Sequence, residues 1–543
     1  MTFKEEIENL KKEKTKYYRE NRDYIIRDYN DEKELAKEYE SRQLLELLQN
    51  VDDTGSTKAQ ITWDKENKTI AIANMGESFS ASGIKSIMLG HFSTKIKPHF
   101  IGNKGLGFRS VLNWAEAIHI YSNECKVTFS EKNARTVFEE ELKLRDEQKK
   151  ELRKAKGLKN TAIPFPVLAI PTIKEDTSNN EWKTIVEIKY KTTAEDSIKK
   201  QVNELCAELL LFLNNIETLV ICITGQTEQT YTSKRLVKED YSEITINETS
   251  WKVFTKEKPL PDKLQDKEKS DPQKYQIKVA FQEDLSDRYY KLFNYFPTKV
   301  SVSLPCIIHG TFELNSSRDY LNDSDVNIYI LKKLRKLLKK CAVHLTTKNV
   351  DWRPFKLLTP VEKSTDSDLI ADFYSKIDKL KKETKVYPAI SDNYIPLNKA
   401  IYYNNHFNSF FKENFKDTLP DLILPLEDGI VNEFKNDTYK KEYLVEQIDK
   451  LSYKGISIEQ RAQLIILLNE VYKSDTTEEL FSLLINQKKN EVIPKTTTTF
   501  TPVKRAKEEF EIPDEVKVDF INTALYDAIL NKIKDGFDKK EPE

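Results

Sequence analysis

The sequence has few of the residues that build disulfide frameworks or metal centres. Its 543 residues include five cysteines, Cys125, Cys206, Cys222, Cys306 and Cys341, and no two of them stand at a short spacing. This scatter argues against both a disulfide framework and a zinc site and predicts buried, reduced thiols. The six histidines do not cluster either, so we assign none of them to catalysis.

Long apolar runs are also absent. No run reaches about 18 residues, the length that a membrane-spanning helix needs. The first segment, MTFKEEIENLKKEKTKYYRE, is charged throughout and lacks the apolar core of a signal peptide. We therefore expect a cytoplasmic protein with no membrane partner.

Neither sign of charge dominates. Lys and Arg number 87, Asp and Glu number 88, and the net charge is −1. This balance predicts no general attraction to nucleic acid, although a local basic face could still bind it. The best local candidate is LKKLRKLLKK (331–340), which as a helix would be half core and half solvated.

The first half of the chain alternates helical and strand-like patterns. The length favours about three or four domains. Residues 1 to about 50 contain no Pro or Gly and predict helix. A hairpin is predicted over AQITWD and KTIAIAN, and a helix over SASGIKSIMLG. A glycine-rich loop entering a helix is predicted over GNKGLGFRSVLNWA, followed by two strands over EAIHIYS and KVTFSE. The charged EEELKLRDEQKKELRKAKG predicts a solvated helix or a lid-like insertion.

A second α/β pattern follows the strand TIVEIKYK. It consists of the helix SIKKQVNELCAELLLFL, the strands TLVICITG, YQIKVAFQ and VSVSLPCII, and the helix VNIYILKKLRKLLKKCAVHL. From about residue 350 the pattern is mostly helical, with capping boxes expected at Ser457 to Gln460 and Thr476 to Glu479. IPKTTTTFTPVKRAKEEFEIP reads as an extended linker. The final helix, VDFINTALYDAILNKIKDGF, stands alone, which suggests a partner chain or a continuation.

The stretch ELLQNVDD (46–53) combines an apolar helix with a polar line. Glu46, Asn50 and Asp53 share one narrow arc, while Leu44, Leu47, Leu48 and Val51 cover most of the remaining circumference. The helix should therefore be buried nearly all round. A buried polar line is costly unless it meets a ligand, a metal or water. The alternative is an amphipathic surface helix whose polar side chains are simply exposed to solvent.

Two later segments suit a phosphate ligand. Gly102, Gly105 and Gly107 stand directly before a helix, where glycine lets the backbone approach phosphate oxygens and the helix offers free N–H groups. Such a loop is a weak signal alone. FSTK (92–95) adds hydroxyl and ammonium groups, and the strand ending at Asn74 turns through Gly76.

These pieces, in this order, resemble the GHKL ATPase superfamily, which includes gyrase, the ninety-kilodalton heat-shock chaperone, histidine kinases and MutL. IHGTFELNSSRDYLNDSD is similar to the chaperone-type and sacsin-like branch, and the resemblance covers residues from about 35 to 345. It implies an α+β protein with an N-terminal two-layer α/β sandwich, the Bergerat-type ATP-binding fold. The expected domains are an ATP-binding domain with a helical extension (1–195), a transducer-like α/β domain (196–350), a mostly helical domain (351–490), and a linker with a terminal helix (491–543).

The resemblance also implies roles for particular residues. Glu46 matches the general base, Asn50 the Mg²⁺ ligand and Asp53 a polar site near the nucleotide. Arg318 matches an arginine that reaches the γ-phosphate from the second domain and supports catalysis. The alternative for Arg318 is a surface contact with Asp319 or Asp323.

The remaining implied contacts concern the base and the phosphates. Asn74 stands where most members have an Asp that accepts a hydrogen bond from the adenine amino group, so adenine affinity is in doubt; alternatively Asn74 only caps its turn. Thr184 matches a threonine beside the adenine, with Lys183 in place of the usual preceding glycine. The other implied nucleotide-binding residues, of which 93–95 could be only a polar loop, are Gly76, Ser93, Thr94, Lys95, Gly102, Lys104, Gly105, Leu106, Gly107 and Phe108.

The function implied is a slow, Mg²⁺-dependent ATPase that acts as a conformational switch or dimeric clamp, with ATP and Mg²⁺ as its cofactors. A homodimer or a partner protein is expected through the C-terminal region. Bacterial sacsin-like ATPases often serve antiviral defence, so the resemblance extends to that role. Two alternatives stay open: a nucleotide-gated scaffold without turnover, supported by Asn74, and a nucleic-acid-linked clamp of MutL or MORC type, which needs a basic face.

Overall fold

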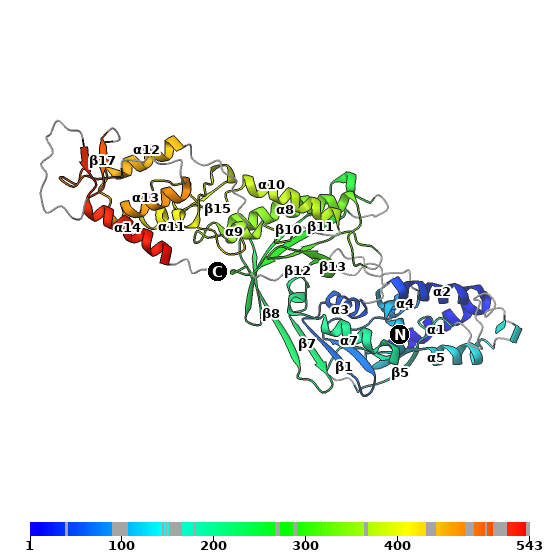
Figure 1. The fold of residues 1–543 in the computed structure, drawn as a ribbon. Coiled ribbons are helices and arrows are strands. Elements are labelled where there is room, and N and C mark those ends of the chain that lie inside the picture. The colour runs from blue at the N-terminus through cyan, green and yellow to red at the C-terminus, as the bar shows by residue number, and fades with distance from the viewer. Residues whose placement is uncertain are drawn as a thin grey trace. The chain divides into compact units, whose positions relative to one another are not determined.

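The chain forms two compact units. The computed structural model describes residues 1–38, 42–89, 107–143, 146–147, 149–150, 165–178, 181–266, 272–285, 290–315, 318–362, 367–430, 441–472, 483–494, 497–502 and 518–538. The first unit comprises residues 1–337 and 361–373, and the second comprises 338–360 and 374–543. The protein mixes helices with one large sheet, consistent with an α+β class (Figure 1).

The N-terminal region is helical, as predicted, but it is divided into separate helices. It contains α1 (Phe3–Glu20), α2 (Asp23–Glu38) and α3 (Gln43–Asp53). Asn21 ends α1 in an extended conformation, and its side-chain oxygen accepts a hydrogen bond from the Asp23 N–H at 3.0 Å, which starts α2. An asparagine side chain competes with the helix for backbone groups, so the chain turns here without Pro or Gly.

The large sheet begins with strands that the sequence predicts well. The hairpin of β1 (Lys58–Asp64) and β2 (Thr69–Asn74) is confirmed, as are β3 (Ala115–Ser122), β4 (Cys125–Ser130), β6 (Thr184–Tyr190) and β7 (Thr218–Ile223). A further strand, β5 (Thr172–Glu175), pairs with β4. The sheet runs in the order β13-β12-β14-β11-β10-β9-β8-β7-β1-β2-β6-β3-β4-β5, and β7 lies parallel to β1.

Helices cover the N-terminal part of this sheet. α3 and α7 (Glu195–Asn203) lie on the strands that include β1 and β7 (Figure 1). Leu44, Leu48 and Ile61 belong to the core between them. The predicted helix α4 (Ala81–Leu89) is present, and the segment after the glycine-rich loop forms a short 3-10 helix, η1 (Gly107–Asn113). The shorter helical segments are α5 (Glu131–Thr136), η2 (Val137–Glu141) and η3 (Thr192–Ala194).

Two predicted elements in the second α/β pattern are each divided. The helix expected over SIKKQVNELCAELLLFL is α7 followed by a 3-10 helix, η4 (Ala207–Leu211), because Cys206 has an extended backbone. The segment VSVSLPCII, which was expected to form one strand, instead contains the end of β13 (Phe296–Val302) and the start of β14 (Ile307–Gly310). Pro305 lies between them and has no N–H to donate to a ladder.

Several strands in this region carry no clear sequence signal. They are β8 (Gln229–Val237), β9 (Ser242–Ile246), β10 (Thr249–Pro259) and β12 (Tyr290–Asn294). β8 pairs with β9, β9 with β10, and β10 with the predicted β11 (Lys274–Phe281). The short helix η5 (Asp262–Leu264) follows β10. The long α8 (Asp325–Leu345) is present as predicted. Its Leu331 and Leu334 are buried and Lys332 is exposed, which confirms the half-core, half-solvated interpretation of 331–340.

The second unit contains the remaining helices and two small sheets. Its last helix does not stand alone as expected: Leu525 and Ala528 of α14 pack with Ala462 of α13. The expected partner chain at the C-terminal region stays a prediction. The capping box of Ser457 and Gln460 is confirmed by both reciprocal hydrogen bonds. Thr476 to Glu479 lies outside the described residues. The elements of this region are α9 (Arg353–Leu357), α10 (Asp368–Glu383), β15 (Tyr387–Pro388), β16 (Tyr394–Ile395), η6 (Leu397–Lys399), α11 (Asn405–Asn414), α12 (Lys441–Ser452), α13 (Ile458–Tyr472), β17 (Thr498–Phe500), β18 (Val518–Phe520) and α14 (Thr523–Asp538).

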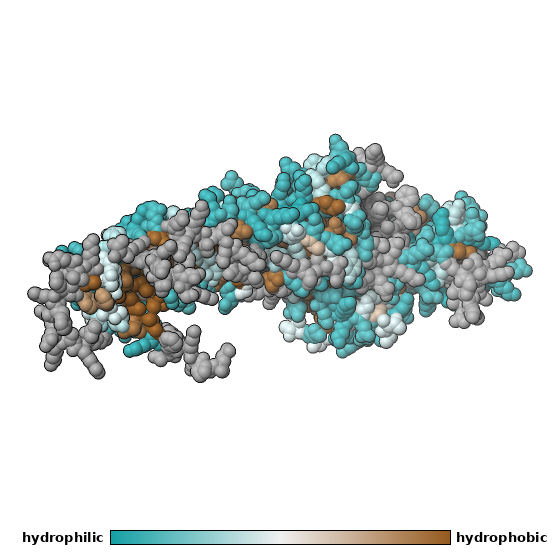
Figure 2. Space-filling model, turned by 45° about the horizontal axis from the view of Figure 1, so that its top comes forward, coloured by the Kyte–Doolittle hydropathy of each residue, from teal (hydrophilic) through white to brown (hydrophobic). Residues whose placement is uncertain are grey.

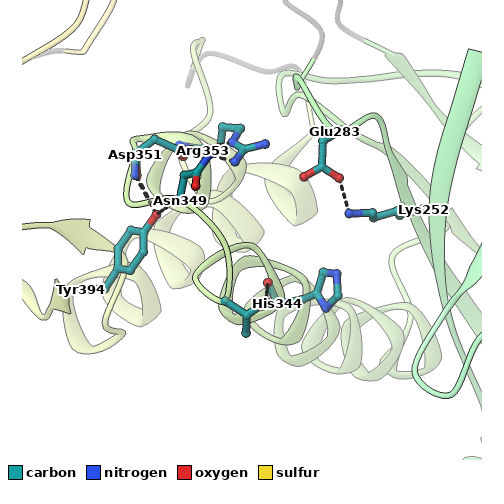
Figure 3. A network of polar contacts seen from close by, with 8 residues as sticks. Lys252, Glu283, His344, Asn349, Asp351, Arg353 and Tyr394 are labelled. Carbon is teal, nitrogen blue, oxygen red and sulfur yellow. Dashed lines mark hydrogen bonds and ion pairs between the residues drawn. The ribbon is translucent and has the colours of Figure 1, made fainter. Parts of the chain in front are cut away.

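A polar network fixes the start of α9 in the second unit (Figure 3). The Asp351 N–H donates to Tyr394 Oη at 2.9 Å, and Asp351 Oδ2 accepts from Arg353 Nε at 2.8 Å. Lys252 and Glu283, also drawn in Figure 3, form an ion pair between β10 and the segment after β11 in the first unit.

The surface is mainly hydrophilic in the view of Figure 2, with one apolar patch over the second unit. Exposed apolar residues of that unit include Phe500, Phe520 and Ile533. No helix among the described residues combines the length and the apolar character that crossing a membrane requires.

Candidate functional site

Helix α3 is the centre of the candidate site. Glu46, Asn50 and Asp53 recur at helical spacing along it, and Leu44 and Leu48 on its other faces are fully buried. Glu46 itself is 5% exposed. The prediction of a helix buried nearly all round is confirmed, so its polar groups need partners within the protein or in a ligand.

One cavity of about 220 Å³ opens beside α3. Asn50 and Asp53 line it from α3, Asn74 from β2, Phe108 from η1 and Thr184 from β6. Five of the predicted nucleotide-binding residues, drawn from four separate segments, therefore face one space. Glu77, Ser78, Ser80 and Ser86 add further polar groups to its wall.

Asn74 is held by its own turn. Its Oδ1 accepts from the Gly76 N–H at 3.1 Å and lies 3.4 Å from Thr54 Oγ1. Because the Gly76 N–H can donate only to an acceptor, the amide atom that it meets must be the Asn74 oxygen. The amide nitrogen, Nδ2, is then the group of Asn74 that is left for a ligand in the cavity. Asn74 therefore both caps the turn, as the alternative interpretation holds, and lines the cavity.

Gly76 is required by close packing. A Cβ built at this position would lie 2.0 Å from Thr54 Oγ1 and 2.7 Å from the Thr54 carbonyl oxygen. The Glu77 N–H donates to that same carbonyl at 3.0 Å. The turn after β2 is thus attached directly to the end of α3, and both Glu77 of this turn and Thr54 line the cavity.

Thr184 is oriented by a chain of hydroxyl groups. It pairs with Asn74 in the β2–β6 register, and its Oγ1 lies 3.1 Å from Ser122 Oγ. The Ser122 hydroxyl donates to the Lys183 carbonyl at 3.1 Å, so its single proton is used there. Thr184 must then donate to Ser122, and its oxygen is left as an acceptor.

Arg318 meets the helix rather than the solvent. Its Nη1 donates to Glu46 Oε1 at 2.7 Å and to Gln49 Oε1 at 3.3 Å. Asp319 pairs with Lys299 at 2.6 Å, so the contacts of the Arg318 guanidinium with α3 differ from the alternative of a surface contact with Asp319 or Asp323. Glu46 and Arg318 are joined to each other, and neither is among the residues that line the cavity.

Two functional contacts of α3 carry no sequence signal. The buried carboxylate of Asp52 accepts the N–H groups of Asn214, Asn215 and Ile216 at 2.8–3.0 Å and thereby ties α3 to the segment before β7. Burial raises its pKa, against the effect of these hydrogen bonds. Arg42, directly before α3, binds the carbonyl oxygens of Arg318 and Pro297. Neither contact could be found from local pattern, because its partners lie far along the chain.

Seven predicted phosphate-binding residues fall outside the described residues, and nothing is assigned to them here: Ser93, Thr94, Lys95, Gly102, Lys104, Gly105 and Leu106. Gly107 begins η1, and Phe108 follows it in the cavity wall. In the described part of the chain, no three His, Cys, Asp or Glu side chains gather as a metal site. The Asn50 amide oxygen is the type of hard ligand that Mg²⁺ accepts.

Comparisons with known proteins give distant likenesses. No protein-family model matches the chain. The plant Protein NO VEIN of Arabidopsis thaliana is 26% identical over 315 residues, which are 54% of this chain and 11% of that protein, so the chain spans about a tenth of its relative.

Among solved structures, the N-terminal domain of a DNA repair protein has a TM-score of 0.26 at 10% identity and covers 48% of this chain and 74% of that one. The 43K ATPase domain of Thermus thermophilus gyrase B, in complex with an aminocoumarin, has a TM-score of 0.25 at 11% identity, over 48% and 61% of the two chains. Scores at this level carry no argument about function.

Proposed function

We propose that the first unit binds ATP with Mg²⁺ in the cavity beside α3 and hydrolyses it slowly, as a nucleotide-driven switch of GHKL type. The observation that supports this most is the cavity itself, which is walled by Asn50, Asp53, Asn74, Phe108 and Thr184. The sequence predicts all five as nucleotide ligands, and they come from four separate segments of the chain.

The polar pair at Asn74 and Thr184 suits the edge of a purine. The amide Nδ2 of Asn74 supplies a donor, and the Thr184 oxygen supplies an acceptor. The Watson–Crick edge of adenine presents a ring acceptor, N1, beside the amino donor, so it can satisfy both groups at once. An Asn in place of Asp therefore changes which atom is read without removing base recognition, and it weakens the contact by the loss of charge.

The other end of the cavity suits the phosphates and their cation. Asn50 offers an amide oxygen to Mg²⁺, which prefers oxygen ligands and takes the rest from phosphate and water. When bound, the cation would neutralise part of the triphosphate charge. Phosphoryl transfer then depends mainly on positioning and charge stabilisation, so a few well-placed polar groups are sufficient.

Glu46 and Arg318 supply the chemistry and the switch. For hydrolysis, Glu46 Oε1 would orient the attacking water and take its proton, and Arg318 would move its guanidinium to the terminal phosphate. In the structure these two groups neutralise each other at 2.7 Å. Nucleotide arrival must therefore separate them, which makes turnover slow and links it to a movement of the Arg318 side chain.

Phosphate release by the wild type, Glu46→Gln and the control Glu116→Gln tests this function. Glu116 is an exposed residue of β3, paired only loosely with Lys189 at 3.6 Å. We expect Glu46→Gln to lose roughly 100-fold or more in rate and Glu116→Gln to match the wild type. Equal rates for all three would remove Glu46 from catalysis, and no detectable Mg²⁺–ATP binding by calorimetry would remove the proposal.

The same ion pair supports one alternative, a scaffold that binds nucleotide without turnover, because a paired Glu46 cannot act as a base. ATP binding without phosphate release would establish it. The clamp, its partner at the C-terminal region, the nucleic-acid-linked role and the antiviral role remain predictions from the resemblance.

A further inference from the structure

A buried arginine holds the loop that carries Arg318. Arg42 directly precedes α3 and is 5% exposed. Its Nη1 donates to the Arg318 carbonyl oxygen at 3.0 Å and to the Pro297 carbonyl oxygen at 3.3 Å. Its Nε is buried and has no hydrogen-bond partner. A buried guanidinium that binds backbone carbonyls, rather than a carboxylate, is costly to keep unless the contact has a use.

The loop adopts a conformation that needs such support. Arg318 has φ +56, in the left-handed region that a non-glycine residue enters only at a cost. Within the loop, the Arg318 N–H donates to the Asn315 carbonyl and the Asp319 N–H donates to Asn315 Oδ1, both at 2.9 Å. Arg42 adds a contact from outside, to the carbonyl of the strained residue itself.

Helix α3 therefore meets the same loop at two levels. Arg42 fixes the backbone of Arg318, while Glu46, one turn further along, binds its side chain. If the backbone is held, the guanidinium can leave Glu46 by side-chain rotation alone. The loop then keeps Arg318 within reach of a ligand in the cavity, because Asn50 on that wall is one turn beyond Glu46 on the same helix.

The charges around Glu46 favour this exchange. The guanidinium groups of Arg42 and Arg318 both lie near the carboxylate of Glu46, and Asp319 adds a second carboxylate near Arg42. Burial lowers the pKa of Arg42; Glu46 and Asp319 act in the opposite direction, and Arg318 adds to the lowering. Because Arg42 stays near Glu46 when the Arg318 side chain leaves, part of the charge of that carboxylate remains compensated.

We propose that Arg42 is a positioning residue for the hydrolysis proposed above: it anchors the Arg318 backbone to α3, so that only the Arg318 side chain moves between Glu46 and the nucleotide. This inference rests on the proposed function. It assigns Arg42 no contact with the nucleotide, in agreement with its absence from the residues described as lining the cavity.

Three full-chain variants test the proposal. Arg42→Met removes both carbonyl contacts, and Arg42→Lys can keep one. Arg461→Met is the matched control, because Arg461 is likewise buried and donates to two backbone carbonyls, those of Ser452 and Leu483, in the second unit. Each variant is compared with the wild type by hydrogen exchange and by steady-state phosphate release over a range of ATP concentrations.

Hydrogen exchange tests the anchoring without reference to turnover. We expect Arg42→Met to speed exchange of the amides of Arg318, Asp319 and Tyr320 roughly tenfold, the effect of losing a buried charged hydrogen bond. Amides of β11 and β14 should be unchanged. Arg42→Lys should lie between Arg42→Met and the wild type, and Arg461→Met should leave the loop unaffected. Unchanged loop exchange in Arg42→Met would overturn the proposal.

Kinetics test the link to the reaction. We expect kcat to fall roughly tenfold or more in Arg42→Met with KM nearly constant, since Arg42 does not line the cavity. Arg42→Lys should recover part of kcat. A rise in KM alone, or an unchanged kcat with a loosened loop, would overturn the positioning role. Wild-type protein that binds ATP but releases no phosphate would instead refute the proposed hydrolysis, and the reaction role of Arg42 with it. If Arg42→Met does not fold, the Arg42→Lys data decide.

Discussion

Removal of the Arg318 guanidinium should expose how strongly the loop and α3 are coupled. Glu46 and Arg318 form an ion pair at 2.7 Å in which the side chains are 6% and 23% exposed. In Arg318→Ala the carboxylate stays almost buried and loses its closest cation. Arg42 remains nearby and compensates part of the charge, although it donates its hydrogen bonds to backbone carbonyls.

The expected magnitude follows from this geometry. Two unit charges about 4 Å apart interact by about 4 kcal/mol at the effective dielectric constant of a partly buried site, and breaking a buried pair typically costs about 3–5 kcal/mol. Because Arg42 retains some of the attraction, we expect Arg318→Ala to lower the free energy of unfolding of the first unit by about 2–3 kcal/mol. Glu46→Gln keeps an acceptor for Arg318 and should cost about 1 kcal/mol.

Urea unfolding followed by tryptophan fluorescence can measure this in one unit. Four of the five tryptophans, Trp63, Trp114, Trp182 and Trp251, lie in the first unit, and only Trp352 lies in the second. A Trp352→Phe background therefore makes the signal specific to the first unit, which matters because two units need not unfold together. The double mutant of Glu46→Gln and Arg318→Ala completes a cycle whose coupling energy should be about 1–2 kcal/mol.

The ion pair of Lys299 and Asp319 on the same loop is the matched control. Lys299 is 53% exposed, so solvent screens the pair and Lys299→Ala should cost at most about 1 kcal/mol. Strictly additive costs for Glu46→Gln and Arg318→Ala, or equal costs for Lys299→Ala and Arg318→Ala, would show that the Glu46–Arg318 contact does not couple the loop to α3.

Three further outcomes are expected. Asp52→Asn turns one acceptor toward backbone N–H groups into a donor, so urea unfolding should show a loss of about 2–3 kcal/mol; unchanged stability would contradict the anchoring of α3. Burial lowers the pKa of Lys278 to about 8 in the folded state, from 10.5 in the unfolded state. Between these pH values the unfolded state holds a proton that the folded state lacks, so the free energy of unfolding rises with pH. Lys278→Met should therefore be more stable than the wild type by about 3 kcal/mol at pH 7 and by less at pH 9.5; a pH-independent difference would refute the assignment. Gly76→Ala must displace Thr54, so ATP affinity measured by calorimetry should fall roughly tenfold, and unaltered affinity would show that the turn does not set the cavity.

Local pattern was a good guide where one face of an element is apolar. The β1–β2 hairpin and the buried face of α3 alternate or repeat clearly, and both were predicted. Strand β8, QTYTSKRLV, is almost wholly exposed or half-exposed and has no apolar alternation. Its conformation comes from backbone pairing with β7 and β9, which single-sequence periodicity does not record.

Helical spacing places Glu46, Asn50 and Asp53 on one face of α3 whatever surrounds them, so their shared face can be predicted from the sequence. What each side chain contacts depends on the rest of the fold. Asn50 and Asp53 line a cavity completed by Asn74 and Thr184, whereas Glu46 pairs with Arg318, 272 residues away along the chain. Contacts at such separation depend on the order of the strands in the sheet and on where its loops end, and a local pattern of residues records neither.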